Sequence, residues 1–391
     1  MAVNHNILFL HSGSFCYDSD IFFEQCIRTE FERLGWQTES ISCLPEKAAP
    51  VLQEFYGKSY DIVFDINGIL PCVRDMDGEF FLNRIQGQKW HYILDHPFYH
   101  DNVLRCSLKD FNVICLDETH AEFIRKHYPH ILKVLCLPLA SAQAGQLIPY
   151  QERGHEVLFT GTYTNSDVIL YQMMKQPKEK KEIFERTVQL LLDQPQLTLE
   201  EAVSHYVDDE NLPGFLKDNY FIDMYLRACL REELLALLLK KDIPVTVYGH
   251  NWEDFIEKCR RGIPKAESHL HIIGEVPYAK LPDVYADAKI ALNQLPWFKA
   301  GMHDRIPMGM MNGCVCITDE SLYLTDNFID GEQLYFYSLE NMEQAPEIIL
   351  ELLENPDLAV RTAARGYSYA VANLSWKSWL KSFLQCGEIP F

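Results

Sequence analysis

The sequence predicts an α/β protein made of two doubly wound, parallel-sheet domains. Its 391 residues exceed one ordinary core and suit two domains of about 150–200 residues. Short β-rich runs alternate with helical patterns from residue 6 to about 139, which indicates parallel strands joined by crossover helices. The alternation restarts at residue 156 with EVLFTGTY. Each half is therefore expected to form its own open sheet.

The first predicted domain covers residues 1–140. Its helices are expected near 19–34, 46–57 and 118–128. The first apolar run stops after about four residues, so it reads as a strand and not as a signal peptide. The predicted strands lie in NILFLHS, WQTESISC, YDIVFDING, KWHYILDHP, FNVICLD and KVLCLPL.

The second predicted domain covers residues 155–374 and follows a small, polar linker at 141–154, SAQAGQLIPYQERG. A helical insertion is expected at about 166–241, after the first strand. The remaining strands lie in IPVTVYGH, LHIIGEVPY, KIALNQL, CVCITD and LYFYS. In the last segment, 375–391, Trp376, Trp379, Leu380 and Phe383 share one helical face. We expect this helix to cross back to the first domain.

Composition narrows the class of protein. A net charge of −21 disfavours nucleic acid and anionic membranes as partners. No run approaches the ~20 apolar residues of a membrane helix, so we expect no integral membrane protein. The twelve cysteines include no Cys-x-x-Cys pair and suit reduced thiols in the cytoplasm. The oligomeric state stays open.

The stretch GMHDRIPMGMMNGCVCITDE, residues 301–320, carries the strongest chemical signal. It reads as a short helix followed by a buried strand. Asp304 is placed as N-cap and Pro307 in the first turn, with Asn312 and the following glycine as the stop. His303 and Arg305 therefore fall at the start of the helix.

These two side chains predict a diphosphate-binding site. The amides and dipole of a helix start attract anions, and an arginine can bind phosphate with two parallel hydrogen bonds. Asp319 ends the following strand, at the edge where doubly wound sheets bind ligands, and Gly301 would let the backbone approach closely. The alternative is that Arg305 pairs with a surface carboxylate and His303 is an ordinary loop residue.

Other loops after strands could complete a donor site. Glycine at such a position allows close approach to phosphate or sugar, although ordinary turns use it as well. A nucleobase could lie near the loop that follows LHIIG, with a tyrosine stacked on it. The further candidates are Gly161, Thr162, Tyr163, Tyr248, Gly249, His250, Glu275, Val276, Tyr278, Met302 and Asn312.

The segments VYGHNW, GEVPYAKLPDVYADAKIALN, GMHDRIPMGMMNGCVCITD and DGEQLYFY resemble the donor domain of CgeB-like glycosyltransferases, a group with the GT-B fold. The resemblance covers roughly 243–340, and it extends more loosely to ILFLHSGSF, YDIVFDING and ILDHPFYH in the first half. It implies two Rossmann-like domains facing a cleft and a nucleotide diphosphate sugar as donor, most often a UDP-sugar. It also implies metal-independent hexosyl transfer to a protein or surface glycan, without a cofactor. Arg305 and His303 would then stabilise the leaving diphosphate.

One departure from the family pattern bears on activity. Related retaining enzymes carry a glutamate three residues after the arginine, often with another eight positions earlier. Met308 and Ala300 occupy those positions here, so Asp319 or Glu332 would have to replace them. Two alternatives to a glycosyltransferase stay open. One is a sugar-nucleotide epimerase or hydrolase, and the other is a catalytically lapsed binding or scaffold subunit.

On the acceptor side, the loops after the first-domain strands supply His11, Gly13 and Asn67. Asp95 and His96 could form a general base for an acceptor hydroxyl, because an unperturbed histidine titrates near ~6.5. The alternative is that Asp95 caps a helix. We predict no metal site, since the Asp-x-Asp pairs at 18–20 and 75–77 lie in turn-like surroundings away from the phosphate candidates.

Overall fold

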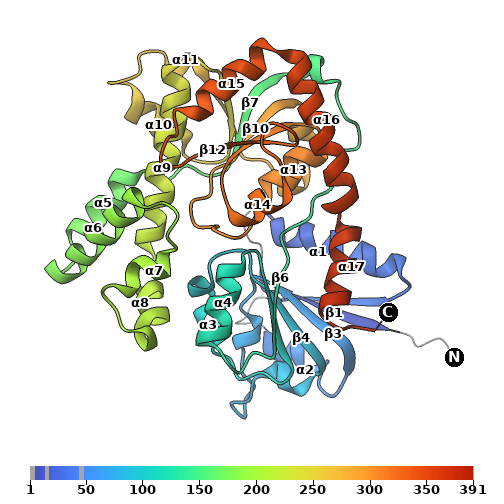
Figure 1. The fold of residues 1–391 in the computed structure, drawn as a ribbon. Helices are drawn as coiled ribbons and strands as arrows, with labels where there is room; N and C mark the ends of the chain where they lie inside the picture. The colour runs from blue at the N-terminus through green and yellow to red at the C-terminus, as the bar shows by residue number, and fades with distance from the viewer. Residues whose placement is uncertain (1–4, 14–16, 44–47, 391) are drawn as a thin grey trace. The chain divides into compact units, whose positions relative to one another are not determined.

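The structure, a computed structural model, describes residues 5–13, 17–43 and 48–390. The described chain contains two six-stranded parallel sheets with flanking helices (Figure 1). The predicted fold class is thereby confirmed. Contacts divide the chain into two compact units, the first with residues 1–138, 277–279 and 376–391, the second with residues 139–276 and 280–375.

The sheet of the first unit has the order β2-β1-β3-β4-β5-β6. Its strands follow the predicted β-rich runs: β1 (Asn6–His11), β2 (Gln37–Ser42), β3 (Ser59–Ile66), β4 (Gln86–Tyr92), β5 (Phe111–Cys115) and β6 (Lys133–Cys136). Its α-helices are α1 (Ser19–Arg33), α2 (Ala48–Gln53), α3 (Asp101–Leu104), α4 (Glu118–His127) and α17 (Trp376–Cys386). Short 3₁₀ turns are η2 (Leu70–Cys72), η3 (Phe81–Arg84) and η4 (Pro97–His100). Of the helix predicted over 46–57, the structure contains α2, which ends at Gln53, and residues 46 and 47 lie outside the described residues.

The last helix, α17, buries its aromatic face in the core of the first unit. Trp379 stacks on Tyr92 with ring centroids 5.4 Å apart. Phe383 packs edge-on against Trp90 at 5.1 Å. Aromatic rings of this size bury a large apolar area, and tilted or offset pairs add to it.

The sheet of the second unit has the order β12-β11-β10-β7-β8-β9. Its strands are β7 (His155–Thr160), β8 (Val245–Tyr248), β9 (Leu270–Gly274), β10 (Ala288–Leu292), β11 (Val315–Asp319) and β12 (Tyr335–Tyr337). Helices outside the insertion are α10 (Trp252–Cys259), α11 (Ala266–His269), α12 (Leu281–Ala286), α13 (Arg305–Met311), α14 (Leu322–Asn327), α15 (Gln344–Glu354) and α16 (Pro356–Asn373). Chain order reverses between β7 and β10, which lie side by side in the sheet.

The expected insertion is mainly helical. It comprises α5 (Ser166–Met174), α6 (Lys178–Asp193), α7 (Leu199–Ser204), η6 (Asp209–Asn211), α8 (Leu212–Asp218) and the long α9 (Phe221–Lys240). Helices α5 to α8 form a green group beside α9 (Figure 1). The C-terminal half of α9 is rich in leucine and joins the core of the second sheet, where Leu234 and Leu238 are fully buried. The insertion is thus anchored by α9.

The segment expected as a linker, 141–154, lies within the second unit. It contains η5 (Tyr150–Glu152). Arg153 fastens it by donating hydrogen bonds to the carbonyl oxygens of Ala288, at 2.7 Å, and Gly313, at 2.6 Å. Among the helices in the described part of the chain, none is both long and apolar enough to span a membrane.

Gly309 lets α13 lie close to the sheet. A Cβ at this position would be 2.6 Å from Cys316 Sγ and 2.9 Å from Ala291 Cβ. We expect Gly309→Ala to lower the free energy of unfolding by about 1–3 kcal/mol, the usual cost of overpacking. Urea unfolding followed by circular dichroism measures the change.

Gly214 in α8 provides the matched control, because a Cβ there would meet nothing within 4 Å. Gly214→Ala should be neutral or stabilising by up to ~1 kcal/mol, as expected from helix propensity. Equal effects of the two alanines would contradict the close packing of α13.

Candidate functional site

Arg305 lies at the carboxyl edge of the second sheet, where chain order reverses. The residue begins α13 and is 8% exposed. Its Nε donates to the carbonyl oxygen of Thr160, the last residue of β7, at 2.6 Å. Its Nη1 donates to Oδ1 of Asn293, directly after β10, at 3.1 Å. Open α/β sheets bind ligands at this reversal.

The guanidinium of Arg305 fits against Gly161. A Cβ at Gly161 would lie 2.9 Å from Nη2 of Arg305, and Gly161 has a φ of +148°. No carboxylate among the described residues forms an ion pair with Arg305, whose hydrogen-bond acceptors are a carbonyl and an amide. The alternative of pairing with a surface carboxylate therefore does not describe this arginine.

Arg231, on α9, is a second arginine at the same place. The guanidinium carbons of Arg231 and Arg305 lie 5.2 and 4.9 Å from the centre of the Phe159 ring. Arg231 Nη1 donates to the carbonyl oxygen of Thr162 at 2.6 Å. Its Nε is buried and has no hydrogen-bond partner among the described residues. Sequence reasoning missed Arg231, because one arginine in a charged, helical insertion gives no local signal.

The two arginines form an electrostatically unbalanced pair. Burial lowers the pKa of Arg231, and the positive charges of Arg305 and Arg227 lower it further. An arginine nonetheless stays protonated in proteins, so two positive charges lie close to the Phe159 ring. A bound anion would relieve this repulsion. The arrangement is therefore suited to an anionic group such as phosphate.

His303 adds a neutral imidazole beside the arginines. Burial lowers the pKa of His303; Asp304 opposes this change, while Arg305 and Arg231 reinforce it. His303 Nδ1 lies 2.5 Å from Oδ1 of Asp304. Asp304 occupies the predicted N-cap position, but its side chain makes no capping hydrogen bond, which corrects that expectation. Helix α13 ends at Met311, immediately before the predicted Asn-Gly stop.

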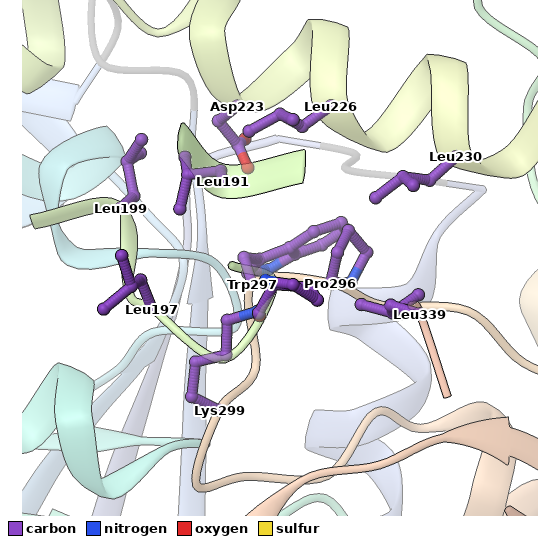
Figure 2. A pocket seen from close by; sticks show the side chains of 11 residues that line it. Leu191, Leu197, Leu199, Asp223, Leu226, Leu230, Pro296, Trp297, Lys299 and Leu339 are labelled. Carbon is purple, nitrogen blue, oxygen red and sulfur yellow. The ribbon is translucent and has the colours of Figure 1, made fainter. Parts of the chain in front are cut away.

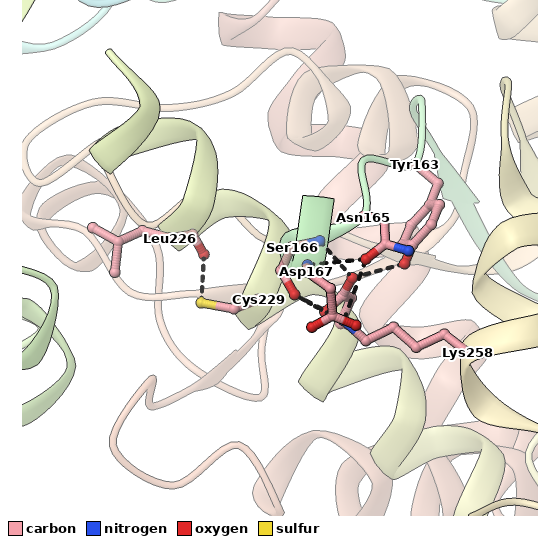
Figure 3. Close-up of polar contacts among 8 residues, drawn as sticks. Tyr163, Asn165, Ser166, Asp167, Leu226, Cys229 and Lys258 are labelled. Carbon is pink, nitrogen blue, oxygen red and sulfur yellow. Dashed lines mark hydrogen bonds and ion pairs between the residues drawn. The ribbon is translucent and has the colours of Figure 1, made fainter. Parts of the chain in front are cut away.

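Tyr163, a predicted donor-site residue, belongs to the core instead. Its hydroxyl donates to Oε1 of Glu232 at 2.7 Å, and the residue is 1% exposed. Ser166 and Lys258 also donate to this carboxylate, and Figure 3 shows the three donors converging. Glu232 therefore joins the start of α5 to α9 and α10, and the side chain of Tyr163 is part of this buried network.

Tyr278, expected to stack on a nucleobase, packs in the core of the first unit. Residues 277–279 belong to the first unit. The amide of Tyr278 donates to the carbonyl oxygen of Tyr17 at 2.9 Å, and its ring packs against Phe23 on α1 at 4.9 Å. The side chain is buried in that core.

Asp319 and Asn312, both predicted to bind the donor, make hydrogen bonds within the protein. Both carboxylate oxygens of Asp319 accept from the amide of Leu295, at 2.9 and 3.1 Å, and burial raises the pKa of Asp319 to about 6. Asn312 is fully buried; it accepts from the Ala144 amide at 2.7 Å and donates to the Ala142 carbonyl at 3.2 Å. Asp319 thus fixes the loop after β10, and Asn312 fixes the segment around residues 142–144.

The loop after β8 combines packing with an exposed pair. A Cβ on Gly249 would lie 2.3 Å from the carbonyl oxygen of Gly161, so this glycine is needed for backbone packing. Tyr248 reaches back to His155, with Oη and Nε2 3.4 Å apart. His250 and Glu275 come together at 2.6 Å and are about half exposed. Half-buried Val276 follows Glu275.

Around α13, Gly301 accepts from Ser321 Oγ at 2.6 Å, and Met302 is buried. The two positions that carry acids in retaining relatives have no acid here. Met308 is 2% exposed, with its sulfur 3.3 Å from Ser141 Oγ. Glu332, considered as a substitute, lies 3.8 Å from Arg365 Nη1 and is about half exposed.

In the first unit, His11 ends β1 and forms ion pairs with Glu24 and, at 3.8 Å, with Asp20, both on α1. Burial alone would lower its pKa, but hydrogen bonds to Asp20 and Glu24 and their charges outweigh burial and raise the pKa of His11 to about 9. His11 is therefore protonated at neutral pH and cannot accept a proton there.

The Asp95–His96 pair, predicted as a general base, lies in a network of internal hydrogen bonds. His96 is 2% exposed, and its Nδ1 accepts from the Phe98 amide at 3.2 Å as the N-cap of η4. Asp95 accepts from Asn67 Nδ2 at 3.3 Å. Asn67, with a φ of +50°, also accepts from the Leu94 amide. A cap was the alternative interpretation of this segment, and a cap is present. The capping residue of η4 is His96, however, and not Asp95.

The structure contains a different carboxylate–histidine pair, which sequence reasoning missed. Asp65 Oδ2, at the end of β3, lies 2.5 Å from His91 Nδ1 on the neighbouring strand β4. The side chains are 3% and 1% exposed, so the pair is internal.

Gly13, also expected near this edge, has a φ of +123°. Asp75, set aside as a metal ligand, pairs with Arg84 at 2.8 Å.

Comparison with solved structures places the fold among the GT-B glycosyltransferases. The sucrose-phosphate synthase of Thermosynechococcus elongatus aligns with a TM-score of 0.57 and 12% identity, over 98% of each chain. Anabaena HepE in complex with UDP and glucose aligns with a TM-score of 0.53 and 10% identity, over 98% of this chain and 99% of that one. A glycosyltransferase of Rickettsia africae gives 0.52 and 10%, over 99% of each.

At the level of sequence, residues 227–385 match the family model described as Glycosyl transferase-like. This part of the chain therefore carries the sequence pattern of that family, and it includes Arg231, His303 and Arg305. No curated protein matches the chain.

The ion pairs of His11 predict a pH-dependent stability. Its pKa is about 9 when folded and 6.5 ordinarily, so the contribution is complete below pH 6.5 and is lost as pH rises through 9. We expect roughly 2–3 kcal/mol less free energy of unfolding at high pH from this group. His11→Gln should remove that part of the pH dependence in urea unfolding. His130→Gln, at an exposed residue of the same unit, should keep it; an unchanged profile in His11→Gln would contradict the assignment.

Proposed function

We propose that the protein is a glycosyltransferase that takes a sugar from a nucleotide diphosphate sugar, with a UDP-sugar as first candidate. The observation that carries this is the arginine pair at the reversal point of the second sheet, inside the segment that matches the glycosyl transferase-like model. The fold, shared with a protein bound to UDP and glucose, and the motifs that resemble CgeB-like enzymes are consistent with it. Transfer of a hexose to a protein or surface glycan is the acceptor side of the proposal.

The arginines suit the charge changes of sugar transfer. As the bond from the anomeric carbon to the β-phosphate oxygen breaks, its electron pair stays on the diphosphate, and the acceptor hydroxyl bonds to the carbon and loses its proton. Arg231 and Arg305 would bind the diphosphate more strongly as this negative charge grows, which lowers the barrier. Because two fixed cations supply the charge, we propose that transfer is metal-independent. His303, neutral and next to Arg305, would add a hydrogen bond.

A second candidate is a binding subunit that holds the donor without transferring it. It is favoured by the buried Met308 at a family acid position and by the engagement of His11 and His96 in internal contacts. Hydrolysis or epimerisation of the donor is the remaining alternative. Release of UDP that requires an added acceptor indicates transfer, release without acceptor indicates hydrolysis, and affinity without turnover indicates the binding subunit.

We expect Arg305→Gln and Arg231→Gln each to weaken UDP binding about 10- to 100-fold, because a charge-assisted hydrogen bond to phosphate is lost. Turnover of the UDP-sugar should fall ~100- to 1000-fold. Isothermal titration calorimetry measures the affinity.

Arg365→Gln is the matched control, since Arg365 is exposed and pairs only loosely with Glu332. It should bind UDP like the wild type. Wild-type affinity for UDP and GDP in both site variants would refute the diphosphate site.

A further inference from the structure

Two cysteine side chains of the first unit lie in contact, although they are far apart in the sequence. Cys72 ends η2, the turn after β3, and Cys106 follows α3, which comes after β4. Their sulfur atoms are 3.5 Å apart. A disulfide bond is about 2 Å long, so an approach of about 1.5 Å separates this contact from a covalent bond. The two thiols are therefore placed to form a disulfide.

The backbone around both cysteines is able to make this approach. The turn η2 has three residues, and residues 106–108 belong to no helix or strand. Cys115 and Cys136 provide the contrast. They are partners in the register of β5 and β6, where the hydrogen bonds of the sheet hold both backbones, and Cys115 is fully buried. Of these two pairs, Cys72 and Cys106 form the one that can adjust.

Exposure and charge give the two thiols different roles. Cys72 is half-buried, whereas Cys106 is 4% exposed, so a small oxidant in the solvent meets Cys72 first. The contact with Cys72 and burial raise the pKa of Cys106, and the charge of Arg74 opposes this rise. Cys106 therefore keeps its proton, which it donates either to the sulfur of Cys72 or to the carbonyl oxygen of Asn102, at 3.3 Å. Redox-sensitive cysteines often have such a second thiol beside an accessible one.

We propose that Cys72 and Cys106 are a site of reversible oxidation, with hydrogen peroxide as the oxidant. The thiolate of Cys72 attacks one oxygen of the peroxide, the O–O bond breaks, and the other oxygen leaves as hydroxide, which takes up a proton to become water. Cys72 is then a sulfenic acid. The sulfur of Cys106 displaces its hydroxyl group, which leaves with the Cys106 proton as a second water. Two electrons thereby pass from the sulfurs to the peroxide.

The new bond would fasten a part of the first unit that includes predicted acceptor-side residues. It closes the chain between residues 72 and 106, which contains β4, η4 and the Asp95–His96 segment. A disulfide restricts the unfolded chain, so the oxidised protein is expected to resist unfolding more strongly. This inference goes beyond sugar transfer, because neither cysteine belongs to the proposed diphosphate site.

Peptide mapping of the full chain under non-reducing conditions tests the site. After treatment with hydrogen peroxide, mass spectrometry should find the Cys72 and Cys106 peptides joined, with the loss of two hydrogen atoms. Cys115 and Cys136 should stay reduced. The urea midpoint of unfolding should shift upward on oxidation, and dithiothreitol should reverse both changes.

Three serine variants separate the roles of the thiols. In Cys106→Ser the disulfide should be lost, and the sulfenic acid of Cys72 should persist and react with dimedone. In Cys72→Ser the disulfide should also be lost, and Cys106 should stay reduced because it is buried. Cys43→Ser is the matched control, since Cys43 is another half-buried cysteine of the same unit; it should form the disulfide like the wild type.

The wild-type chain carries its own standard for peroxide exposure, because Cys386 is exposed. Oxidation of Cys386 without a bond between Cys72 and Cys106 would overturn the proposal, whether or not the variants fold. Equal dimedone labelling of Cys72 in the wild type and in folded Cys106→Ser would also overturn it, because Cys106 would then not consume the sulfenic acid. No nucleotide is used, so these outcomes are independent of the diphosphate site.

Discussion

The placement of the Arg305 guanidinium at the reversal point of the second sheet is the constraint on which the rest of the site depends. A buried charge without a counter-ion costs several kcal/mol. Its hydrogen bonds to the Thr160 carbonyl and the Asn293 amide contribute about 1.5–3 kcal/mol each. These bonds can offset the cost of burial, but they leave the positive charge itself uncompensated. No carboxylate among the described residues pairs with Arg305, so a bound anion would add a partner for its charge.

The surrounding residues serve to keep this geometry. Gly161 provides the space for the guanidinium, and Gly249 is required because its backbone touches Gly161. Asp319 fixes the loop that begins with Asn293, because its carboxylate holds the Leu295 amide. Gly161, Gly249 and Asp319 were expected to contact a ligand. In the structure they hold Arg305 and the loop after β10 in place. Their residue types suited a binding site, but their hydrogen bonds are directed into the protein.

The fold could be predicted because alternation of β-rich and helical runs is a local property of the sequence. Arg305 could be singled out because it lies beside a recognisable helix start and strand. Arg231 could not, since its contact with Phe159 joins positions far apart in the chain and depends on how α9 packs. Burial of a single side chain is equally hard to predict from sequence. His96 and Tyr163 have side chains suited to a binding site, yet packing buries both. The Asp65–His91 pair depends on the register of β3 and β4, which a motif does not specify.

The helical insertion has a larger part in the chemistry than its position in the sequence suggests. Glu232 ties α9 to the start of α5 and to α10, and the next residue on its N-terminal side is Arg231. One turn earlier, Arg227 contacts Trp297, and Leu226 and Leu230 of α9 line a small apolar pocket with Trp297 (Figure 2). A rotation of α9 would therefore move the arginines and the wall of this pocket together. The hydrogen bonds of Glu232 and the burial of Leu234 and Leu238 in the core both oppose such a rotation.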